Sequence, residues 1–375
     1  MKKIVVFGAG MVGSTIAADL SSDYDVTAVD LSEENLYELQ KKKIKTIRAD
    51  FNDKNRMREI AVENDLSIGA VPGFMGYEFL KNLILCGVNV VDISFFPEDA
   101  FDLDGMAKAG KVTAVVDCGV APGMSNFILG YHNKRMKVEN FECYVGGLPF
   151  EREFPFQYKA PFSPIDVIEE YTRPARIVVN GKVVVKEPLS EPELVNFEKI
   201  GMLEAFNTDG LRTLLKTMKI SNMKEKTLRY QGHIEYIQVL INIGLFSHEP
   251  LEIDGVKVKP INLTSKLLFD KWKLGKEDDE FTIMRVIIEG MENNIKKKYI
   301  YDLFDRFDPI TKTSSMARST GYTAAAVANL VINGRFTKKG ISPPEYIGED
   351  ESLFNDVLSY LIDRDVIYRT KAEQS

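Results

Sequence analysis

The sequence has few cysteines and histidines, with 3 of each in 375 residues. Cys86, Cys118 and Cys143 lie far apart and form no C-x-x-C pair, which argues against a disulfide framework or a thiolate zinc site. The histidines and carboxylates show no metal-ligand spacing, so we expect no metal. The cysteine usage indicates a reducing compartment.

Long apolar runs and an excess of positive charge are also missing. Apolar runs such as residues 324–330 are much shorter than the ~20 residues that span a bilayer. Met1-Lys2-Lys3 leads directly into a strand, without the apolar region and cleavage site of a signal peptide. Because the formal net charge is −7, a grip on a phosphate backbone is not expected. We therefore expect a cytoplasmic protein that binds a small molecule, with no nucleic acid and no membrane as partner.

The first 125 residues or so alternate between short strands rich in valine and isoleucine and amphipathic helices. Alternation of this kind is typical of a parallel sheet covered on both faces, with right-handed crossovers. The sequence therefore predicts an α/β protein whose residues 1–123 form a doubly wound parallel sheet. The strands of this sheet are predicted at residues 3–7, 25–30, 45–48, 66–71, 89–93 and 112–116.

The pattern changes near residues 119–123. Further strands are predicted at 139–145, 283–289 and 297–303, and Asn180-Gly181 is a strong signal for a two-residue hairpin turn within 176–186. Strands that pair through hairpins form mixed or antiparallel sheets, so we expect a second, mixed α/β domain over residues 124–313. Helices return after residue 314, and we expect the segment 314–375 to pack on the first domain.

Residues 8–13 read G-A-G-M-V-G and connect the first strand to the first helix. Gly8 permits the tight turn, Gly10 lets a pyrophosphate approach the backbone, and Gly13 lets the helix pack closely on the sheet. The free amides at the helix start attract the anion. The motif in this context predicts a Rossmann-type dinucleotide site; the alternative is a glycine turn that binds nothing.

Asp30 ends the second predicted strand. Its carboxylate can accept a hydrogen bond from a ribose 2′-hydroxyl and would repel a 2′-phosphate. We expect no arginine beside it, so the predicted cofactor is NAD and not NADP. The alternative is that Asp30 is a solvated strand end.

Further cofactor contacts are expected at the carboxyl ends of the other strands, where the crevice of such a sheet opens. Asp50 and Phe51 are candidates for the adenosine, Val71 and Pro72 for the ribose, and Ser94 for the nicotinamide. Core packing is an equally good explanation for Phe51 and Val71. The full predicted set of cofactor residues is Gly8, Gly10, Met11, Val12, Gly13, Asp30, Asp50, Phe51, Val71, Pro72 and Ser94.

Several segments resemble the saccharopine dehydrogenase superfamily, and the likeness runs through nearly the whole chain. It is closest to the lysine 6-dehydrogenase-like branch. The resemblance implies a Rossmann domain completed by the C-terminal segment, an inserted mixed α/β domain, and a homodimer. That branch uses NAD to oxidise the ε-amine of lysine with release of ammonia. The segments are 70–74 (AVPGF), 91–95 (VDISF), 117–126 (DCGVAPGMSN), 163–164 (SP), 171–175 (YTRPA), 228–233 (LRYQGH) and 314–318 (SSMAR).

The likeness to the saccharopine enzymes themselves is partial. Ser94-Phe95 stands where those enzymes have a Ser-Tyr pair, and Ala121 stands in place of an aspartate. Asn207-Thr208-Asp209 lacks the arginine of the corresponding cluster. Because a missing carboxylate removes a partner for a substrate ammonium, these departures favour lysine over saccharopine.

Amine oxidation requires a neutral amine, hence a base or a desolvated pocket, and charged groups that hold the amino-acid end. We predict His233 as the base and Lys159 as a second candidate; a structural histidine and a solvated lysine are the alternatives. Arg229 is expected to clamp the substrate carboxylate or to form a salt bridge within its domain. Asp209 is expected to hold an ammonium or to cap a helix. The other predicted substrate contacts are Ser94, Phe95, Ser163 and Arg173.

The sequence thus predicts NAD-dependent oxidative deamination of the ε-amine of L-lysine. Within the same class, the alternative is oxidoreduction of saccharopine, a secondary amine. From another class, the alternative is a regulatory NAD sensor without turnover, because residues 3–31 also resemble the ligand-binding domains that gate potassium channels.

Overall fold

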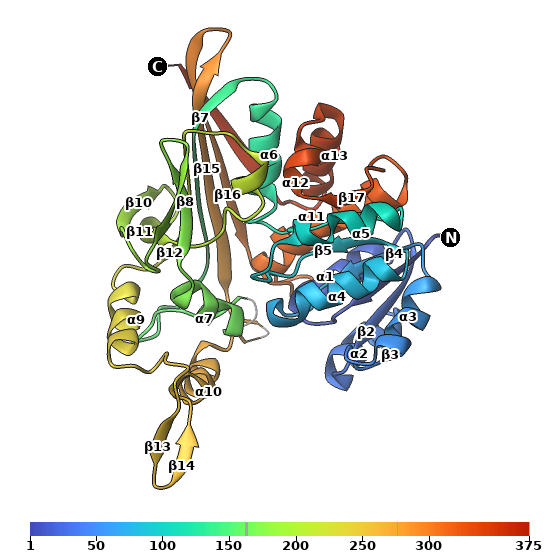
Figure 1. Ribbon diagram of the computed structural model, residues 1–375, viewed down its shortest axis with the longest axis horizontal. Helices are drawn as coiled ribbons and strands as arrows, with labels where there is room; N and C mark the ends of the chain where they lie inside the picture. Colours follow the sequence, from blue (N-terminus) through green and yellow to red (C-terminus); the bar gives the residue numbers. More distant parts are fainter. Residues whose placement is uncertain (162–163, 276, 375) are drawn as a thin grey trace.

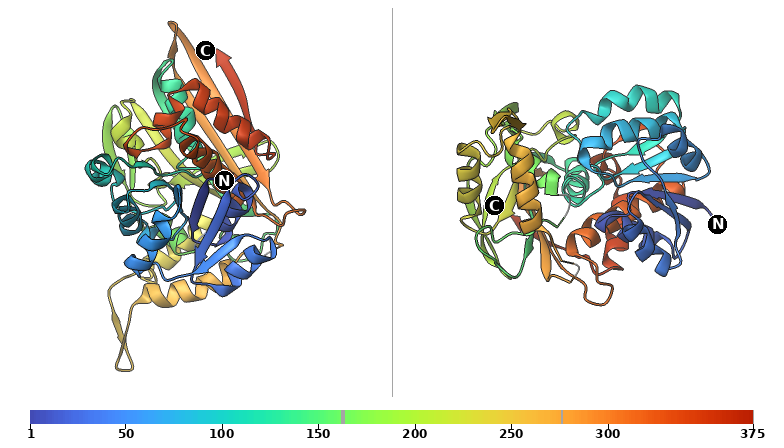
Figure 2. Two further views of the ribbon diagram at one scale, coloured as in Figure 1. Left: turned by 90° about the vertical axis from the view of Figure 1, so that its right-hand side faces the viewer. Right: turned by 90° about the horizontal axis from the view of Figure 1, so that it is seen from below.

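The computed structural model describes residues 1–161, 164–275 and 277–374. Two lobes lie side by side, each built around one sheet (Figure 1). The N-terminus lies on the lobe drawn in blue, and the chain ends near the tip of the long strands of the other lobe (Figures 1 and 2).

The N-terminal lobe contains a seven-stranded sheet with the order β17-β6-β5-β4-β1-β2-β3. Neighbouring strands are parallel, and the chain proceeds in opposite directions on either side of the β1–β4 pair. This confirms the predicted doubly wound sheet, whose crevice opens at the carboxyl ends of β1 and β4. The strands are β1 (Lys3–Phe7), β2 (Asp25–Asp30), β3 (Lys45–Arg48), β4 (Leu66–Gly69), β5 (Asn89–Asp92), β6 (Thr113–Val115) and β17 (Gly340–Ser342).

Helices cover both faces of this sheet (Figures 1 and 2). Their ends follow from local chemistry: the side chain of Ser32 accepts a hydrogen bond from the amide of Asn35, as an N-cap residue does. The buried faces of helix and sheet share apolar cores. These helices are α1 (Met11–Leu20), α2 (Glu33–Lys41), α3 (Lys54–Val62), α4 (Gly73–Leu85), the short 3₁₀ helix η1 (Ala100–Leu103) and α5 (Asp104–Ala109).

Within the described residues, the second lobe contains a nine-stranded mixed sheet. Seven strands follow the order β10-β11-β12-β7-β15-β16-β18, and the β8–β9 hairpin joins at β12. Only β12 and β7 are parallel along this path. The strands are β7 (Lys137–Pro149), β8 (Ala175–Val179), β9 (Lys182–Lys186), β10 (Glu193–Phe197), β11 (Gly201–Asn207), β12 (Asn222–Arg229), β15 (Glu280–Glu292), β16 (Ile295–Arg306) and β18 (Tyr368–Gln374).

The predicted mixed sheet and the hairpin at Asn180-Gly181 are confirmed, since both turn residues have positive φ, 49° and 75°. One side of the sheet carries α6 (Met124–Asn133), and α7 (Pro164–Thr172) lies where the two lobes meet (Figure 1). A separate hairpin projects from the lower end of the molecule in Figure 1. The remaining elements of this lobe are α8 (Leu214–Thr217), α9 (His233–Asn242), β13 (Leu251–Ile253), β14 (Val256–Val258) and α10 (Pro260–Trp272).

The C-terminal segment contributes to both lobes. Helix α11 (Ser315–Ile332) packs against α1, and β17 extends the parallel sheet beside β6. Helices α12 (Pro344–Gly348) and α13 (Glu351–Ile362) then lead to β18, which pairs with β16 in the second sheet. The segment expected to pack on the first domain therefore also supplies an edge strand to the second.

No helix in the described part of the chain is both long enough and apolar enough to cross a membrane.

Candidate active site

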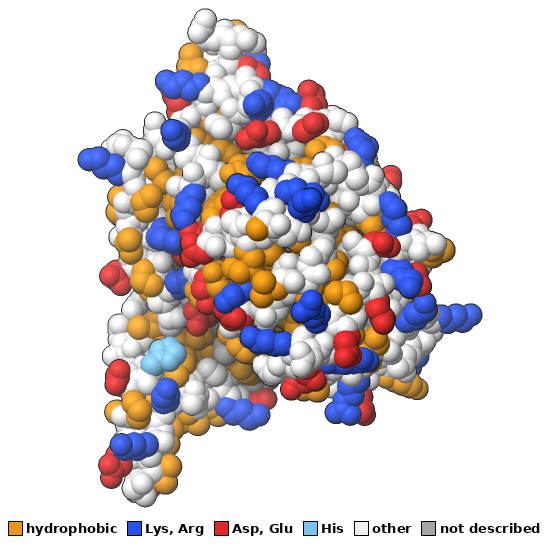
Figure 3. Space-filling view, turned by 45° about the vertical axis from the view of Figure 1, so that its right-hand side comes forward, with side chains coloured by type: hydrophobic (Ala, Val, Ile, Leu, Met, Phe, Trp, Pro, Cys, Tyr) orange, Lys and Arg blue, Asp and Glu red, His pale blue; other side chains and the backbone are white. Residues whose placement is uncertain are grey.

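A cavity of about 1130 Å³ lies between the two lobes. The space-filling view shows hydrophobic side chains in the hollow between them and acidic side chains beside it (Figure 3). The strand ends of the parallel sheet line one part of the cavity, and α7, β7 and β12 line the other. The cavity therefore joins the predicted cofactor crevice to a chamber formed by the second lobe.

The glycine turn has the geometry that the motif predicts. Gly8 has a φ of +100°, and a Cβ there would lie 2.2 Å from the carbonyl oxygen of Ala70. A Cβ on Gly13 would lie 1.9 Å from the carbonyl oxygen of Gly8. In contrast, a Cβ on Gly10 would meet nothing within 4 Å. Gly8 and Gly13 are thus required for packing, whereas Gly10 leaves open space beside the backbone.

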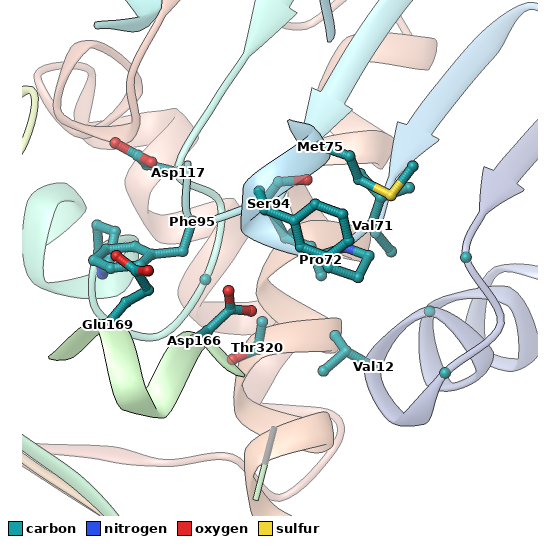
Figure 4. A pocket seen from close by; sticks show the side chains of 18 of the residues that line it. Val12, Val71, Pro72, Met75, Ser94, Phe95, Asp117, Asp166, Glu169 and Thr320 are labelled. Carbon is teal, nitrogen blue, oxygen red and sulfur yellow. The ribbon is translucent and has the colours of Figure 1, made fainter. Parts of the chain in front are cut away.

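That open space fits a dinucleotide pyrophosphate. Gly10, Met11, Val12 and Gly13 all line the cavity at the start of α1. No side chain caps this helix end, so its first-turn amides remain available to an anion. Figure 4 shows Val12 facing the cavity from the side opposite to Asp166.

Asp30 lines the cavity at the end of β2. Its carboxylate accepts hydrogen bonds from the amides of Ala9, at 2.6 Å, and Ser32, at 2.7 Å. The expectation that no arginine lies beside Asp30 is wrong, because the β2–β3 register places Arg48 opposite it. The guanidinium of Arg48 pairs with Glu33 at 2.6 Å, so its charge is already matched.

The remaining predicted cofactor residues also line the cavity. Asp50 accepts hydrogen bonds from the backbone amide and side chain of Asn52. Phe51 packs edge-on against two core phenylalanines and also lines the cavity, so the core-packing explanation is confirmed and the adenosine contact stays a prediction. Ser94 is 2% exposed, and its hydroxyl donates to Asp92, whose burial raises the pKa to about 8. Val71 and Pro72 complete this side (Figure 4).

The chamber in the second lobe is acidic. Helix α7 and the residue after it place Asp166, Glu169, Glu170 and Arg173 on one face, at the i, i+3, i+4, i+7 spacing of a helix. Asp166 and Glu169 point from α7 into the cavity in Figure 4. Six carboxylates and two arginines line this chamber: Asp117, Asp166, Glu169, Glu170, Asp209 and Glu225, against Arg173 and Arg229.

Four of these carboxylates are paired with arginines. The pairs are Glu169–Arg173 at 3.2 Å, Glu170–Arg229 at 3.0 Å, Asp209–Arg176 at 2.7 Å and Asp117–Arg212 at 2.8 Å. Asp166 also has an interaction partner. In contrast, Glu225 makes no direct contact with an arginine of the described chain.

Glu225 lies in β12 and is 4% exposed. Its Oε2 has no hydrogen-bond partner in the described structure. Its pKa is raised to about 8, mainly by burial and also by the charges of Glu170, Asp209 and Asp117. Sequence analysis missed this residue, although strand alternation through Glu225, Thr227 and Arg229 places all three on the cavity side.

The structure does not support His233 as the base. His233 begins α9, is 2% exposed and does not line the cavity. Its Nε2 lies 2.9 Å from the hydroxyl of Tyr171, and its Nδ1 lies 2.8 Å from the carbonyl oxygen of Phe156. Burial and then Arg229 lower its pKa to about 3. The prediction is corrected to a structural histidine, the alternative named for it.

Lys159 is also placed away from the cavity lining. Its ammonium pairs with Asp278 at 2.9 Å and with Glu153 at 3.1 Å. The hydrogen bond with Asp278 is the main cause that raises the pKa of Lys159, which is the wrong direction for a base. The structure assigns it to an ion pair.

Arg229 and Asp209 line the cavity but are bound to other protein groups. Arg229 donates to Glu170, to the hydroxyls of Tyr171 and Tyr158, and to its neighbouring carbonyl. Both oxygens of Asp209 accept from Arg176. The predicted helix cap at Asp209 is wrong, because Thr213 precedes the short helix α8.

Arg173 and Phe95 both line the chamber, as predicted. The Arg173 guanidinium lies 5.3 Å from the centre of the Phe95 ring and, among the described residues, donates one side-chain hydrogen bond, to Glu169. Ser163 lies outside the described residues.

Relatives match with low identity. The chain is 21% identical to carboxyaminopropylagmatine dehydrogenase of Synechocystis, over 94% of each protein. It is 25% identical to saccharopine dehydrogenase [NADP(+), L-glutamate-forming] of Saccharomyces cerevisiae, over 67% of this chain and 60% of the yeast protein. A match to mitochondrial alpha-aminoadipic semialdehyde synthase of Rattus norvegicus, at 21% identity, covers 99% of this chain and 48% of the rat protein. The chain thus spans about half the length of such relatives.

Solved structures share the fold. The apo saccharopine dehydrogenase (L-Glu forming) of Saccharomyces cerevisiae matches with a TM-score of 0.81 at 17% identity, covering all of both chains. Homospermidine synthase from Legionella pneumophila, in complex with NAD, matches with a TM-score of 0.66 at 11% identity, covering 100% of this chain and 91% of that one.

Two family models account for most of the chain. Residues 4–115 match the saccharopine dehydrogenase NADP binding domain, and residues 119–367 match the saccharopine dehydrogenase C-terminal domain. The boundary between them lies at the turn that follows β6, where the parallel sheet leads into the second lobe. The chain therefore belongs to the saccharopine dehydrogenase family.

Proposed function

We propose that the protein is an NAD-dependent dehydrogenase that oxidises the ε-amine of L-lysine and releases ammonia. The broader part of this proposal, an NAD(P)-dependent oxidoreductase acting on an amine, has support from the matched relatives that are named dehydrogenases. The choice of lysine follows from the sequence departures at Phe95 and Ala121 and from the chemistry of the cavity.

One observation carries the proposal. A single cavity runs from the dinucleotide cradle at Gly10 to a chamber lined by six carboxylates, four of which pair with arginines and one of which, Glu225, does not. The buried carboxyl group of Glu225, which contacts no arginine of the described chain, favours a cationic substrate, because a bound ammonium would supply the missing donor and charge partner. Because the cradle and the chamber are parts of one cavity, an amine bound in the chamber would lie beside a cofactor bound in the cradle.

The chain's own residues then have distinct tasks. A bound nicotinamide supplies the hydride acceptor for the reaction. Arg173, which keeps free donors beside Phe95, is placed to hold the substrate carboxylate. The apolar side chains of Val71, Pro72 and Met75 exclude water from the reacting end. A desolvated amine loses its proton more readily, which is the state that oxidation requires.

NAD is proposed over NADP because the carboxylate of Asp30 lines the cradle and would repel a 2′-phosphate. The neighbouring Arg48 is engaged by Glu33 and by the carbonyl oxygen of Leu31. Binding of NADH and NADPH to the purified protein, measured by calorimetry, tests this choice. Tighter binding of NADPH would overturn it.

A second candidate is oxidation of a secondary amine such as saccharopine. It is favoured by the match of 94% of the chain to the Synechocystis enzyme and by the name of the yeast relative. The lysine reaction releases ammonia, whereas the second reaction leaves two larger fragments, so the products separate the candidates.

The experiment is a substrate screen with purified protein. NAD or NADP is combined with lysine, saccharopine or carboxyaminopropylagmatine, and both cofactor reduction and ammonia are followed. Lysine-dependent reduction with equal ammonia release supports the proposal, and turnover of either secondary amine without ammonia supports the second candidate. Tight cofactor binding with no turnover of any amine would overturn both and favour a regulatory sensor.

A further inference from the structure

We infer that Glu225 accepts the proton of the substrate ammonium before the amine is oxidised. This inference rests on the proposed amine dehydrogenase function and assigns the base that His233 and Lys159 do not provide. Three observations support it: the arginine partners of four other chamber carboxylates, the location of Glu225 at the cavity, and the oxygen of Glu225 that has no hydrogen-bond donor in the described structure.

Glu225 is isolated from the arginines that pair with other carboxylates of the chamber. Four of the six chamber carboxylates contact an arginine, and Asp166 has a partner of its own. Glu225 is almost fully buried, and its Oε2 has no hydrogen-bond partner in the described structure. A buried carboxylate without a donor costs free energy unless a ligand supplies one. An ammonium that enters the cavity supplies both a donor and a charge.

The position of Glu225 in the fold also supports this role. Glu225 lies in β12, and its charge interacts with that of Asp117, which follows the last strand before the chain leaves the parallel sheet. Glu225 thus belongs to the second lobe but faces the first. Gly210 makes the room, because a Cβ at that position would lie 1.5 Å from Oε1 of Glu225. The fold therefore keeps a side chain out of the space that this carboxylate occupies.

Asp117 is the competing candidate, because it also lines the cavity and has one oxygen without a partner. Its other oxygen, however, accepts a hydrogen bond from Arg212 at 2.8 Å. An arginine stabilises the ionised form and so weakens the carboxylate as a base. Glu225 has no such contact, and burial raises its pKa to about 8, nearer to that of an amine.

The proposed step moves one proton and no electrons. An N–H bond of the substrate ammonium breaks, its electron pair stays on nitrogen, and an O–H bond forms on Glu225. The neutral amine then carries the free lone pair that its oxidation requires. The charged or titratable groups that interact with Glu225 from the surrounding elements are Glu170, Asp209, Asp117, Arg212 and Cys143.

Three variants of the full-length protein test the inference. Glu225→Gln removes the proton acceptor at nearly constant volume. Gly210→Ala keeps the carboxylate but displaces it through the added Cβ. Glu280→Gln is the matched control, because Glu280 is a buried glutamate of the same lobe that bonds to Ser315 and does not line the cavity.

The measurements are NADH affinity, the pH profile of kcat/KM with lysine, and the protons exchanged when lysine binds the protein–NADH complex. The last is obtained by calorimetry in buffers of different ionisation enthalpy. We expect unchanged NADH affinity in all variants. Glu225→Gln should lower kcat/KM by about 10²- to 10⁴-fold, Gly210→Ala by at least about tenfold, and Glu280→Gln by less than about threefold.

Proton exchange gives a readout without turnover. In the wild type, proton release on lysine binding should decrease as pH rises through the Glu225 pKa of about 8. That change should be absent in Glu225→Gln and present in Glu280→Gln. The inference is overturned if Glu225→Gln binds NADH normally and keeps the wild-type pH profile and proton exchange. If it does not fold, an unaltered profile in Gly210→Ala overturns the inference instead.

The function and the inference fail in different ways. Lysine binding with the Glu225-dependent proton exchange but no turnover would reject the proposed oxidation and retain the proton acceptor. Lysine turnover with no effect of either cavity variant would retain the function and reject Glu225. Absence of binding by any amine would reject both.

Discussion

The backbone amide of Ala9 donates a hydrogen bond to the Oδ2 of Asp30 at 2.6 Å. This contact ties the end of β2 to the glycine turn, while the same carboxylate lines the cofactor crevice. Asp30 therefore links the shape of the glycine turn to the end of β2, where we propose that the ribose binds.

Replacing Asp30 by Asn should weaken NADH binding by about tenfold or more, because a hydrogen bond to a charged group stabilises by about 1.5–3 kcal/mol. NADPH binding should weaken less or improve, because the repulsion of its 2′-phosphate is removed. Calorimetric titration with both cofactors measures the ratio. Asp25→Asn, on the same strand but outside the cavity lining, is the control and should leave both affinities unchanged. An unaltered NADH:NADPH ratio in Asp30→Asn would contradict this prediction.

Two alanine substitutions in the glycine turn should affect different properties, one NADH binding and the other stability. Gly10→Ala places a Cβ in open space, so the protein should fold normally and lose most of its NADH affinity. Gly13→Ala places a Cβ 1.9 Å from the carbonyl oxygen of Gly8, so it should lower the melting temperature. Thermal unfolding and calorimetry with NADH distinguish the two effects. Normal NADH binding by Gly10→Ala would show that the cradle is not used.

The raised pKa of Glu225 should make the stability of the folded protein depend on pH, whether or not the protein is an enzyme. Its pKa is raised from 4.5 to about 8 in the folded protein, so the folded state favours the protonated form. That contribution is complete below about pH 4.5 and is lost as the pH rises through about 8. Glu225→Gln keeps a neutral side chain and should therefore gain stability relative to the wild type over this window.

Thermal unfolding of both proteins across the same pH range measures this difference. The melting temperature of Glu225→Gln minus that of the wild type should increase with pH, at a rate set by up to about 1.4 kcal/mol per pH unit. A difference that is flat with pH would show that the folded and unfolded pKa values of Glu225 are alike.

His233 should behave as a structural residue. His233→Phe removes its bonds to Tyr171 and to the carbonyl oxygen of Phe156, so unfolding should require about 1–3 kcal/mol less. Because the folded pKa of about 3 is below the usual 6.5, the stability contributed by neutral His233 is present above pH 6.5 and is lost as the pH falls towards 3. The variant should lack this acid sensitivity.

Chemical unfolding at several pH values tests these expectations, with His248→Phe, a change at an exposed histidine, as control. The kcat of His233→Phe should stay within about threefold of the wild type at a temperature where both are folded. A loss of kcat by about 10²-fold or more would restore His233 as a catalytic candidate.

Arg173 offers a test of substrate orientation. Arg173→Gln should raise KM for lysine by about tenfold or more, because the shorter, neutral side chain loses the charge that holds a carboxylate. The effect should be much smaller for cadaverine, which has the same terminal amines and no carboxylate. Arg56→Gln, at an exposed position of helix α3, is the control. An equal effect on both substrates would mean that Arg173 does not contact the carboxylate.

The parallel sheet and its cofactor crevice could be predicted because local signals agree there. Buried strands such as β1 and β5 are short runs of valine and isoleucine, and the glycine turn requires positive φ at Gly8. The hairpin at Asn180 and the cap at Ser32 follow from equally local chemistry. All of these features depend on contacts between residues that are close in sequence or in adjacent strands.

The chamber could not be predicted in the same way, because its polar lining obscures the apolar pattern of β12. That strand reads N-M-K-E-K-T-L-R, and Glu225 lies on a buried face although its residue type indicates solvent. His233 shows the opposite error. Its motif marked it as unusual, but the partners that occupy both ring nitrogens come from residues 156 and 171, which only tertiary structure brings near.

The route of the chain between the lobes limits how they can move. It crosses after β6, returns between β16 and α11, and crosses again between α13 and β18. Three separate segments of the chain therefore connect the two lobes, which form opposite walls of one cavity. Any opening of the cavity must bend all three segments together. A single proteolytic cut in one of them should leave the halves associated, so the fragments would separate only under denaturing conditions.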